Sequence, residues 1–151
     1  KMTKNGHLSE REKFDMGIYL STWLGFLGVV CEGFKSLNMR LLLDNERPRE
    51  FKELLPISDG IGKLMKEHSN SLRIFRNNVF HLRESTGFIH HFFDKEVERL
   101  PWAGELHIAL SHFFSQYRIF CEVHYVINGR KGESNMIKKK VTRPKKVALR
   151  Y

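Results

Sequence analysis

One stretch of the sequence, residues 72–84, places residues that could transfer protons and bind phosphate on one side of a predicted helix. At about 100° per residue, Arg73, Asn77, His81 and Glu84 fall within about 80° of arc, with Arg76 on the flank of this polar face. Apolar residues form the opposite stripe, which we expect to face the core: Leu72, Phe75, Val79 and Leu82. The polar face therefore offers cations, an amide and an imidazole within mutual reach.

These groups suit the cleavage of RNA without a metal ion. That reaction needs a base for the 2′-hydroxyl proton, an acid for the departing 5′-oxygen and a cation for the charge on the phosphorane. Histidine exchanges protons near neutral pH and arginine binds phosphate oxygens through two N–H groups, so His81 and Arg76 are of the right types. Since one histidine cannot be base and acid at the same instant, we expect a two-fold homodimer with the site at its interface.

Residues 76–81, with the sequence RNNVFH, resemble the R-x4-6-H motif of HEPN-domain proteins, including the polar residue that often follows the arginine. Members of that superfamily are all-α bundles that dimerise, and many are metal-independent ribonucleases of toxin–antitoxin, abortive-infection or other defence systems. By position, the resemblance implies that Arg76 binds and stabilises the scissile phosphate, that His81 moves the proton, and that Asn77 positions them. It also implies an antitoxin protein as a partner. Arg83 stands where some HEPN toxins carry a tyrosine that a nucleotidyltransferase antitoxin modifies, which argues against that kind of antitoxin.

A structural interpretation of the same residues stands beside the catalytic one. In it, Arg76 or Arg73 forms a surface salt-bridge network with Glu84. Two other pairs in the chain have the same spacing as the motif: Arg83 with His90, and Arg118 with His124. Arg76 is distinguished from them by Asn77 and by the polar face opposite a continuous apolar stripe.

Motifs for other chemistry are incomplete in this sequence. Residues 60–63 (GIGK) lack the earlier glycine and the following Ser or Thr of a phosphate-binding loop. No histidine pair has the helical spacing with an interposed glutamate that a zinc site uses, so we expect no metal site, and we expect no cofactor. The histidines are His7, His68, His81, His90, His91, His107, His112 and His124. Cys121 lies close to His124 in the sequence but is better explained as a core cysteine than as a nucleophile.

Helix start and stop signals predict an all-α fold. We expect helices from residue 9 to about 44, about 58 to 84, about 88 to 99 and about 101 to 128, with a short connector near 49–54. Ser9 and Glu12 form a capping-box pattern, and Pro101 suits a first helical turn. The resulting architecture is an antiparallel four-helix bundle with a short extra helix, HEPN-like in the light of the resemblance.

Length and charge divide the chain into a body and a tail. At 151 residues, the chain is long enough for one domain, which we place at residues 1–130, followed by a basic tail at 131–151. The net charge is +9, and seven cations without an acid lie between residues 138 and 150, so the body is nearly neutral. The tail cations are Lys138, Lys139, Lys140, Arg143, Lys145, Lys146 and Arg150. We expect all of these except Arg150 to bind RNA together with Arg73; the alternative is a solvated, solubilising tail.

Residues 16–31 carry no charge, but at 16 residues they are shorter than a membrane-spanning helix needs. We therefore expect a helix buried on most sides, in the bundle or in a subunit contact, and no membrane association. The two cysteines lie far apart in the sequence and no secretory signal is visible, which favours a cytoplasmic protein. The leading function is a dimeric, metal-independent endoribonuclease of a toxin or defence type, and its alternative is a HEPN-like interaction and dimerisation module without catalysis. A third alternative is a peripheral membrane or nucleic-acid-binding protein that uses only the basic tail.

Overall fold

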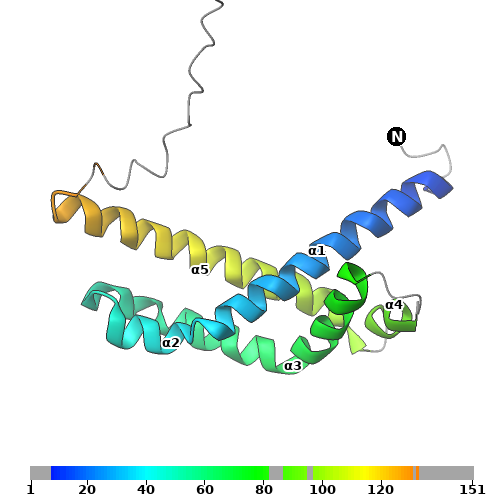
Figure 1. Cartoon of the computed structure of the whole chain (residues 1–151), viewed down its shortest axis with the longest axis horizontal. Coiled ribbons are helices and arrows are strands. Elements are labelled where there is room, and N and C mark those ends of the chain that lie inside the picture. The colour runs from blue at the N-terminus through cyan, green and yellow to red at the C-terminus, as the bar shows by residue number, and fades with distance from the viewer. Residues whose placement is uncertain (1–7, 82–86, 95–96, 131, 133–151) are drawn as a thin grey trace, which may run out of the picture.

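The computed structural model describes residues 8–81, 87–94, 97–130 and 132, and every element within them is helical. The all-α prediction is therefore confirmed. The long helices are α1 (Glu10–Ser36), α3 (Leu55–Phe80) and α5 (Arg99–Ile127). Shorter elements are α2 (Met39–Leu41), a π-helical turn (Leu42–Glu46), a 3-10 helix (Arg49–Leu54) and α4 (Gly87–Phe92). As Figure 1 shows, α3 runs antiparallel to α1 and to α5, and it packs against both.

Helix α1 begins at the predicted capping box. The Ser9 Oγ accepts a hydrogen bond from the backbone N–H of Glu12 at 3.3 Å, and a Glu12 carboxylate oxygen accepts one from the backbone N–H of Ser9 at 2.8 Å. The bond from the Ser9 backbone N–H, together with one that the Ser9 hydroxyl donates to the same carboxylate at 2.7 Å, lowers the pKa of the Glu12 carboxyl below its usual value. The helix ends at Ser36, earlier than expected, and two residues later Asn38 takes a left-handed conformation with φ of 45°, which no helix continues through.

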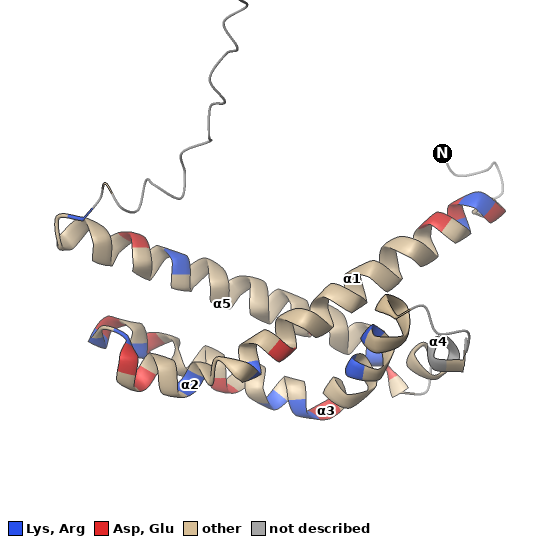
Figure 2. Ribbon diagram, in the orientation of Figure 1, with Lys and Arg blue, Asp and Glu red and all other residues tan. Residues whose placement is uncertain are grey.

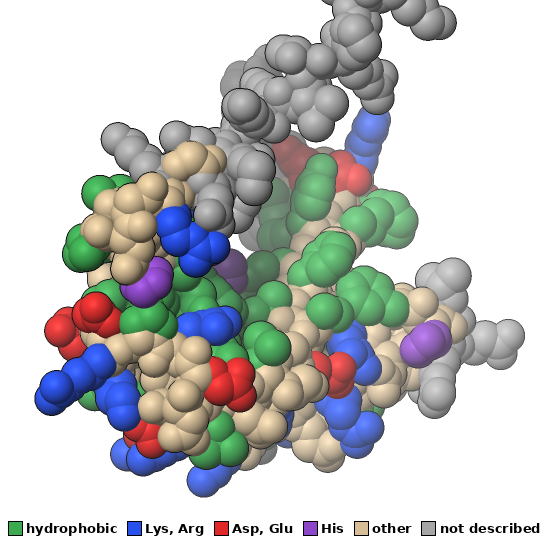
Figure 3. Space-filling model, turned by 60° about the vertical axis from the view of Figure 1, so that its left-hand side comes forward, with side chains coloured by type: hydrophobic (Ala, Val, Ile, Leu, Met, Phe, Trp, Pro, Cys, Tyr) green, Lys and Arg blue, Asp and Glu red, His purple; other side chains and the backbone are tan. Residues whose placement is uncertain are grey.

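The two halves of α1 lie in different surroundings. One face of its second half is buried in the core, whereas the first half projects beyond the other helices (Figure 1). Figure 3 shows hydrophobic side chains on that projecting half, where Phe14 is 70% exposed and Tyr19 is 76% exposed. The expectation of a helix buried on most sides is thus wrong within a single chain, because the second half is buried on one face only and Phe26, on its other side, is 59% exposed.

Helix α3 carries the apolar stripe predicted from the sequence. Leu72 and Phe75 are fully buried and Val79 packs partly buried against the core, while Leu82 lies outside the described residues. The helix begins at Leu55, ahead of the predicted start at residue 58, and His68 bends it with a φ of −132°. The side of α3 that carries the candidate site is therefore fixed by its apolar residues.

The third predicted helix is shorter than expected. Helix α4 ends at Phe92 rather than near residue 99, and Glu98 adopts a left-handed φ of 47° just before α5 begins. The buried Arg99 donates a hydrogen bond from Nη1 to the His91 carbonyl, which provides a partner for a carbonyl near the end of α4. The bundle is thus formed mainly by three long helices. Helix α5 has Pro101 in its first turn, and Asn128 and Gly129 end it as predicted.

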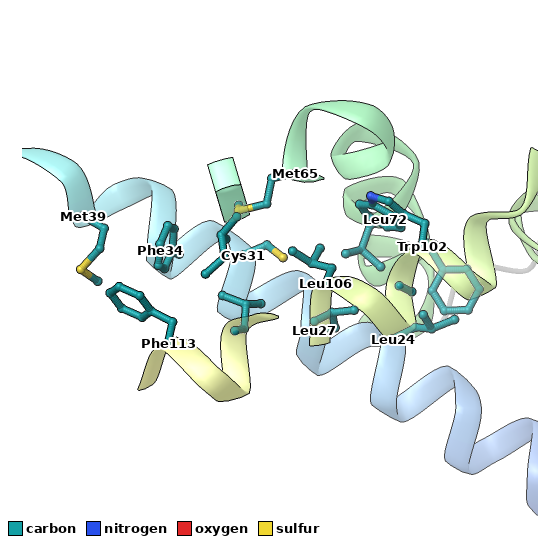
Figure 4. Packing of buried hydrophobic residues seen from close by; sticks show 14 of the residues in the cluster. Leu24, Leu27, Cys31, Phe34, Met39, Met65, Leu72, Trp102, Leu106 and Phe113 are labelled. Carbon is teal, nitrogen blue, oxygen red and sulfur yellow. The ribbon is translucent and has the colours of Figure 1, made fainter. Parts of the chain in front are cut away.

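The core lies where the three long helices meet. Figure 4 shows side chains of α1, α3 and α5 pointing toward one another, among them Leu24, Leu27, Leu72, Leu106 and Phe113. The buried Trp102 of α5 donates a hydrogen bond from its indole N–H to the Leu64 carbonyl of α3 at 2.8 Å. This bond satisfies the only polar atom of a large core side chain and helps to hold α5 against α3.

Candidate active site

The Arg76 side chain of α3 lies against α1 at Gly28. A Cβ atom added to Gly28 of α1 would lie 3.2 Å from the Arg76 Cβ, so the absence of a side chain at Gly28 lets the arginine stem lie against the α1 backbone. From there Arg76 forms an ion pair through Nη1 with the carboxylate of Glu32, one turn further along α1. The Arg76 side chain is 21% exposed and that of Glu32 is 40% exposed. The pair is thus partly shielded from water.

Asn77 holds the guanidinium from the other side. Its Oδ1 accepts hydrogen bonds from the Arg76 Nε at 3.1 Å and from Nη2 at 2.6 Å. A guanidinium has five N–H groups, of which these two bonds and the bond to Glu32 use three. One N–H on each Nη is left without a partner among the described residues, and guanidinium N–H groups bind carboxylate and phosphate oxygens. Asn77 and Glu32 therefore orient a cation that can still bind an anion.

His81 lies at the end of the same helix. It is the residue directly after α3, its backbone N–H donates to the Asn77 carbonyl at 3.1 Å, and it is exposed. Within the part of the chain that the structure describes, its imidazole has no hydrogen-bond partner. The ring is therefore available to a substrate.

The structure joins some of the predicted site residues and separates others. Arg76 and Asn77 are in direct contact, and Arg73 is exposed one turn earlier, where its guanidinium donates to the Asn70 side chain at 3.0 Å. Glu84 and all the tail cations lie outside the described residues. The salt-bridge alternative named Glu84 as the acid, whereas the acid that pairs with Arg76 in the structure is Glu32.

Glu32 and Gly28 are the residues that sequence reasoning missed. The signal was present, since Glu32 is the first charged residue after the uncharged segment 16–31 and follows Gly28 by four positions, on the same face of α1. An acid on an otherwise apolar helix face is stabilised when a nearby cation pairs with it. Nothing in the sequence alone states which arginine supplies it.

The remaining reactive side chains show no second catalytic arrangement among the described residues. No three His, Cys, Asp or Glu side chains there gather in a way that could hold a metal ion. Burial raises the pKa of the Cys31 thiol to about 11 and also raises that of Cys121, so neither is an activated nucleophile. His107 lies on α5 and accepts a hydrogen bond at Nδ1 from the Trp23 indole N–H at 3.3 Å.

Comparison of the chain with models of known protein families, with curated proteins and with solved structures found no match. Helix α1 is long and apolar enough to cross a membrane, judged by length and composition alone, and 28% of its apolar window is buried. Core helices of soluble proteins also meet that criterion.

Proposed function

We propose that this protein is a metal-independent endoribonuclease of the HEPN type that acts as a homodimer. The observation that carries the proposal is the geometry at the end of α3. Arg76 is oriented by Asn77 and Glu32 with two N–H groups to spare, and the exposed His81 follows a little more than one turn later. An oriented anion-binding cation and an accessible imidazole, both from the end of one helix, are the groups that cleavage through the 2′-hydroxyl requires.

The proposed reaction is an internal transfer of the phosphate. His81 removes the 2′-hydroxyl proton, the 2′-oxygen attacks phosphorus, and the bond from phosphorus to the 5′-oxygen breaks. The leaving 5′-oxygen takes a proton from His81 of the partner subunit, which acts as the acid while the first histidine acts as the base. Arg76 stabilises the negative charge that gathers on the phosphorane oxygens. The products are a 2′,3′-cyclic phosphate and a 5′-hydroxyl.

Exposed apolar side chains next to the site support the dimer. The hollow between the first half of α1 and the end of α3 has a volume of about 600 Å³ and is lined by Phe14, Ile18, Leu20, Val79 and Phe93, among others. Phe26 and Phe80, 59% and 44% exposed, meet edge to face at 5.7 Å between ring centroids. A second copy that covered this surface would bury apolar area and lie beside His81, as a composite site requires.

The biological setting follows from the resemblance alone. A nuclease of this type acts as a toxin or a defence protein in the cytoplasm, and an antitoxin protein is then an expected partner. The basic tail, with Lys138 to Lys140, Arg143, Lys145 and Lys146, adds affinity for RNA.

A non-catalytic HEPN-like interaction module is the second candidate. It is favoured by the ion pair of Arg76 with Glu32, because a guanidinium already neutralised by a carboxylate also serves a purely structural role. The exposed imidazole of His81 favours catalysis instead, since a structural histidine would be expected to have a protein partner.

Cleavage of RNA in EDTA separates the two candidates. We expect the wild-type protein to cleave. His81→Ala should lose cleavage while keeping the helical spectrum and melting temperature of the fold, and Arg76→Ala should lose cleavage while keeping the helical spectrum. His112→Ala is the matched control, because His112 is an exposed histidine on α5. Cleavage that survived in both site variants would refute the assignment of the site, and no cleavage by folded wild-type protein would favour the module.

A further inference from the structure

Two adjoining hollows follow the border between α1 and α3. The first has a volume of about 500 Å³, and its charged lining residues are Lys35, Arg40, Asp59, Lys63 and Lys66. The second has a volume of about 260 Å³, and its charged lining residues are Glu32, Lys35 and Arg73. Lys35 lines both, so they form one continuous surface, which we call the α1–α3 groove. Figure 2 shows Lys and Arg positions in both halves of α3 and near the end of α1.

The α1–α3 groove has more positive than negative charge. Its lining contains five cations and two acids, and both acids are already paired. Asp59 binds Arg40 at 2.5 Å, and Glu32 binds Arg76. Glu67 of α3 is exposed but lines neither hollow.

The other cations of the groove have no acidic partner among the described residues. Lys35 donates to the hydroxyl of Ser69 at 3.0 Å, and Arg73 to the amide oxygen of Asn70 at 3.0 Å. Both partners are neutral, so neither cancels the positive charge. Lys63 and Lys66 form no ion pair with any acid that the structure describes. The groove therefore attracts anions.

We propose that the α1–α3 groove binds the sugar-phosphate backbone of a single-stranded RNA segment next to the cleaved bond. This inference rests on the proposed function, because it uses the site at Arg76 as one end of the path. Glu32 connects the two features, since it lines the second hollow and holds Arg76. The cations then guide the strand toward the guanidinium.

The length of the groove fits a strand better than a single phosphate. From Lys63 to Arg76 the helix rises about 20 Å at about 1.5 Å per residue. Phosphates of a stacked strand follow one another about every 3.4 Å along the axis, so the path accommodates about six nucleotides. A mononucleotide would contact only one end of the row Lys63, Lys66, Arg73. Affinity should therefore grow with the length of the RNA.

The test measures binding to RNA that cannot be cleaved. Fluorescence anisotropy of 2′-O-methyl oligonucleotides of four, eight and twelve residues gives the dissociation constant at several salt concentrations, with the full chain. The variant Lys63→Gln/Lys66→Gln removes two cations of the groove. The control Arg11→Gln/Arg118→Gln removes two exposed cations that lie outside it.

Each phosphate contact on a single strand contributes about 0.7 to the steepness with which log K falls against log salt. Because the groove variant loses two such contacts, we expect its slope to be shallower than that of wild type by about 1.4. If the two proteins bind equally at 1 M salt, this difference in slope makes the groove variant bind the twelve-residue RNA about 25-fold more weakly than wild type at 0.1 M salt. The four-residue RNA and the control variant should change much less.

Three results overturn the proposal. They are equal slopes for the groove variant and the control, binding that does not grow with RNA length, and adenosine monophosphate binding as tightly as the twelve-residue RNA, which would identify a small-anion site instead. Failure of the proposed function gives a different pattern. If the wild-type protein does not cleave RNA, but Lys63→Gln/Lys66→Gln still lowers the salt dependence of RNA binding, the groove is supported and the nuclease activity is refuted.

Discussion

Replacing Glu32 by glutamine isolates the effect of its charge on the candidate site. The amide oxygen of the new side chain can still accept the hydrogen bond from the Arg76 Nη1, so the guanidinium keeps its orientation. The negative charge that repels an incoming phosphate is removed. We therefore expect Glu32→Gln to bind RNA more tightly, with a rate of cleavage at saturation within a fewfold of wild type.

The size of this effect follows from Coulomb's law. A phosphate bound to the two remaining N–H groups of Arg76 would lie about 6 Å from the Glu32 carboxylate, because both anions bind one guanidinium. Two unit negative charges at that distance repel each other by about 0.7 kcal/mol at an effective dielectric constant of about 80 and by about 3 kcal/mol at about 20. Glu32 is 40% exposed, which favours the lower end of that range. About 1 kcal/mol corresponds to about a fivefold lower KM.

The assay is steady-state cleavage of a labelled RNA, with kcat and KM determined separately. Glu32→Ala should behave differently from Glu32→Gln: it removes the hydrogen bond and lets Arg76 move, so kcat should fall. Glu105→Gln, which removes an exposed acid on α5, is the control and should leave both constants unchanged. Weaker RNA binding by Glu32→Gln, or equal behaviour of the two Glu32 variants, would refute the reasoning.

Three further predictions concern the packing, the buried thiol and the tail. Gly33→Ala should raise the free energy of unfolding by up to about 1 kcal/mol in urea titrations, because nothing lies within 4 Å of its added Cβ. Gly28→Ala should not show this gain, since its added Cβ would lie 3.2 Å from Arg76. Equal gains in the two variants would contradict the close approach of α1 and α3. Burial raises the pKa of Cys31 to about 11, so the unfolded chain releases the thiol proton first and stability should fall, on the order of 1 kcal/mol, as pH rises from 9 to 11. Cys31→Ala should abolish that dependence, and a slope unchanged in Cys31→Ala would exclude the thiol as its cause. Deleting residues 138–151 should weaken RNA binding and flatten its salt dependence, while an unchanged slope would remove the tail from RNA binding.

Local signals in the sequence predicted much of the fold. The capping box at Ser9 and Glu12, the first-turn Pro101 and the stop at Asn128 and Gly129 each act within a few residues, and the structure confirms them. The apolar stripe of α3 depends only on helical periodicity, and the burial of Leu72 and Phe75 follows it. Local physical chemistry is enough for such features.

Features that depend on contacts between distant residues were not predicted. The ion pair of Arg76 with Glu32 joins positions 44 apart, and the choice of partner depends on how α1 crosses α3 at Gly28. The early end of α4 was not predicted, and near it the His91 carbonyl is bound by the side chain of Arg99, eight positions further along the chain. The exposure of Phe14 and Tyr19 depends on how far α1 extends beyond α3 and α5, which periodicity does not determine.

The most direct test of the central claim is the chemistry of the RNA ends that the purified protein produces. A 5′-labelled RNA is incubated with wild-type protein and with Arg76→Ala in EDTA, beside the same RNA with 2′-deoxy sugars at the cleaved positions. We predict 2′,3′-cyclic phosphate ends from the wild-type protein, and no cleavage of the deoxy-substituted positions or by Arg76→Ala. Ends that carry a 5′-phosphate, or cleavage that does not need the 2′-hydroxyl, would contradict the roles assigned to Arg76 and His81.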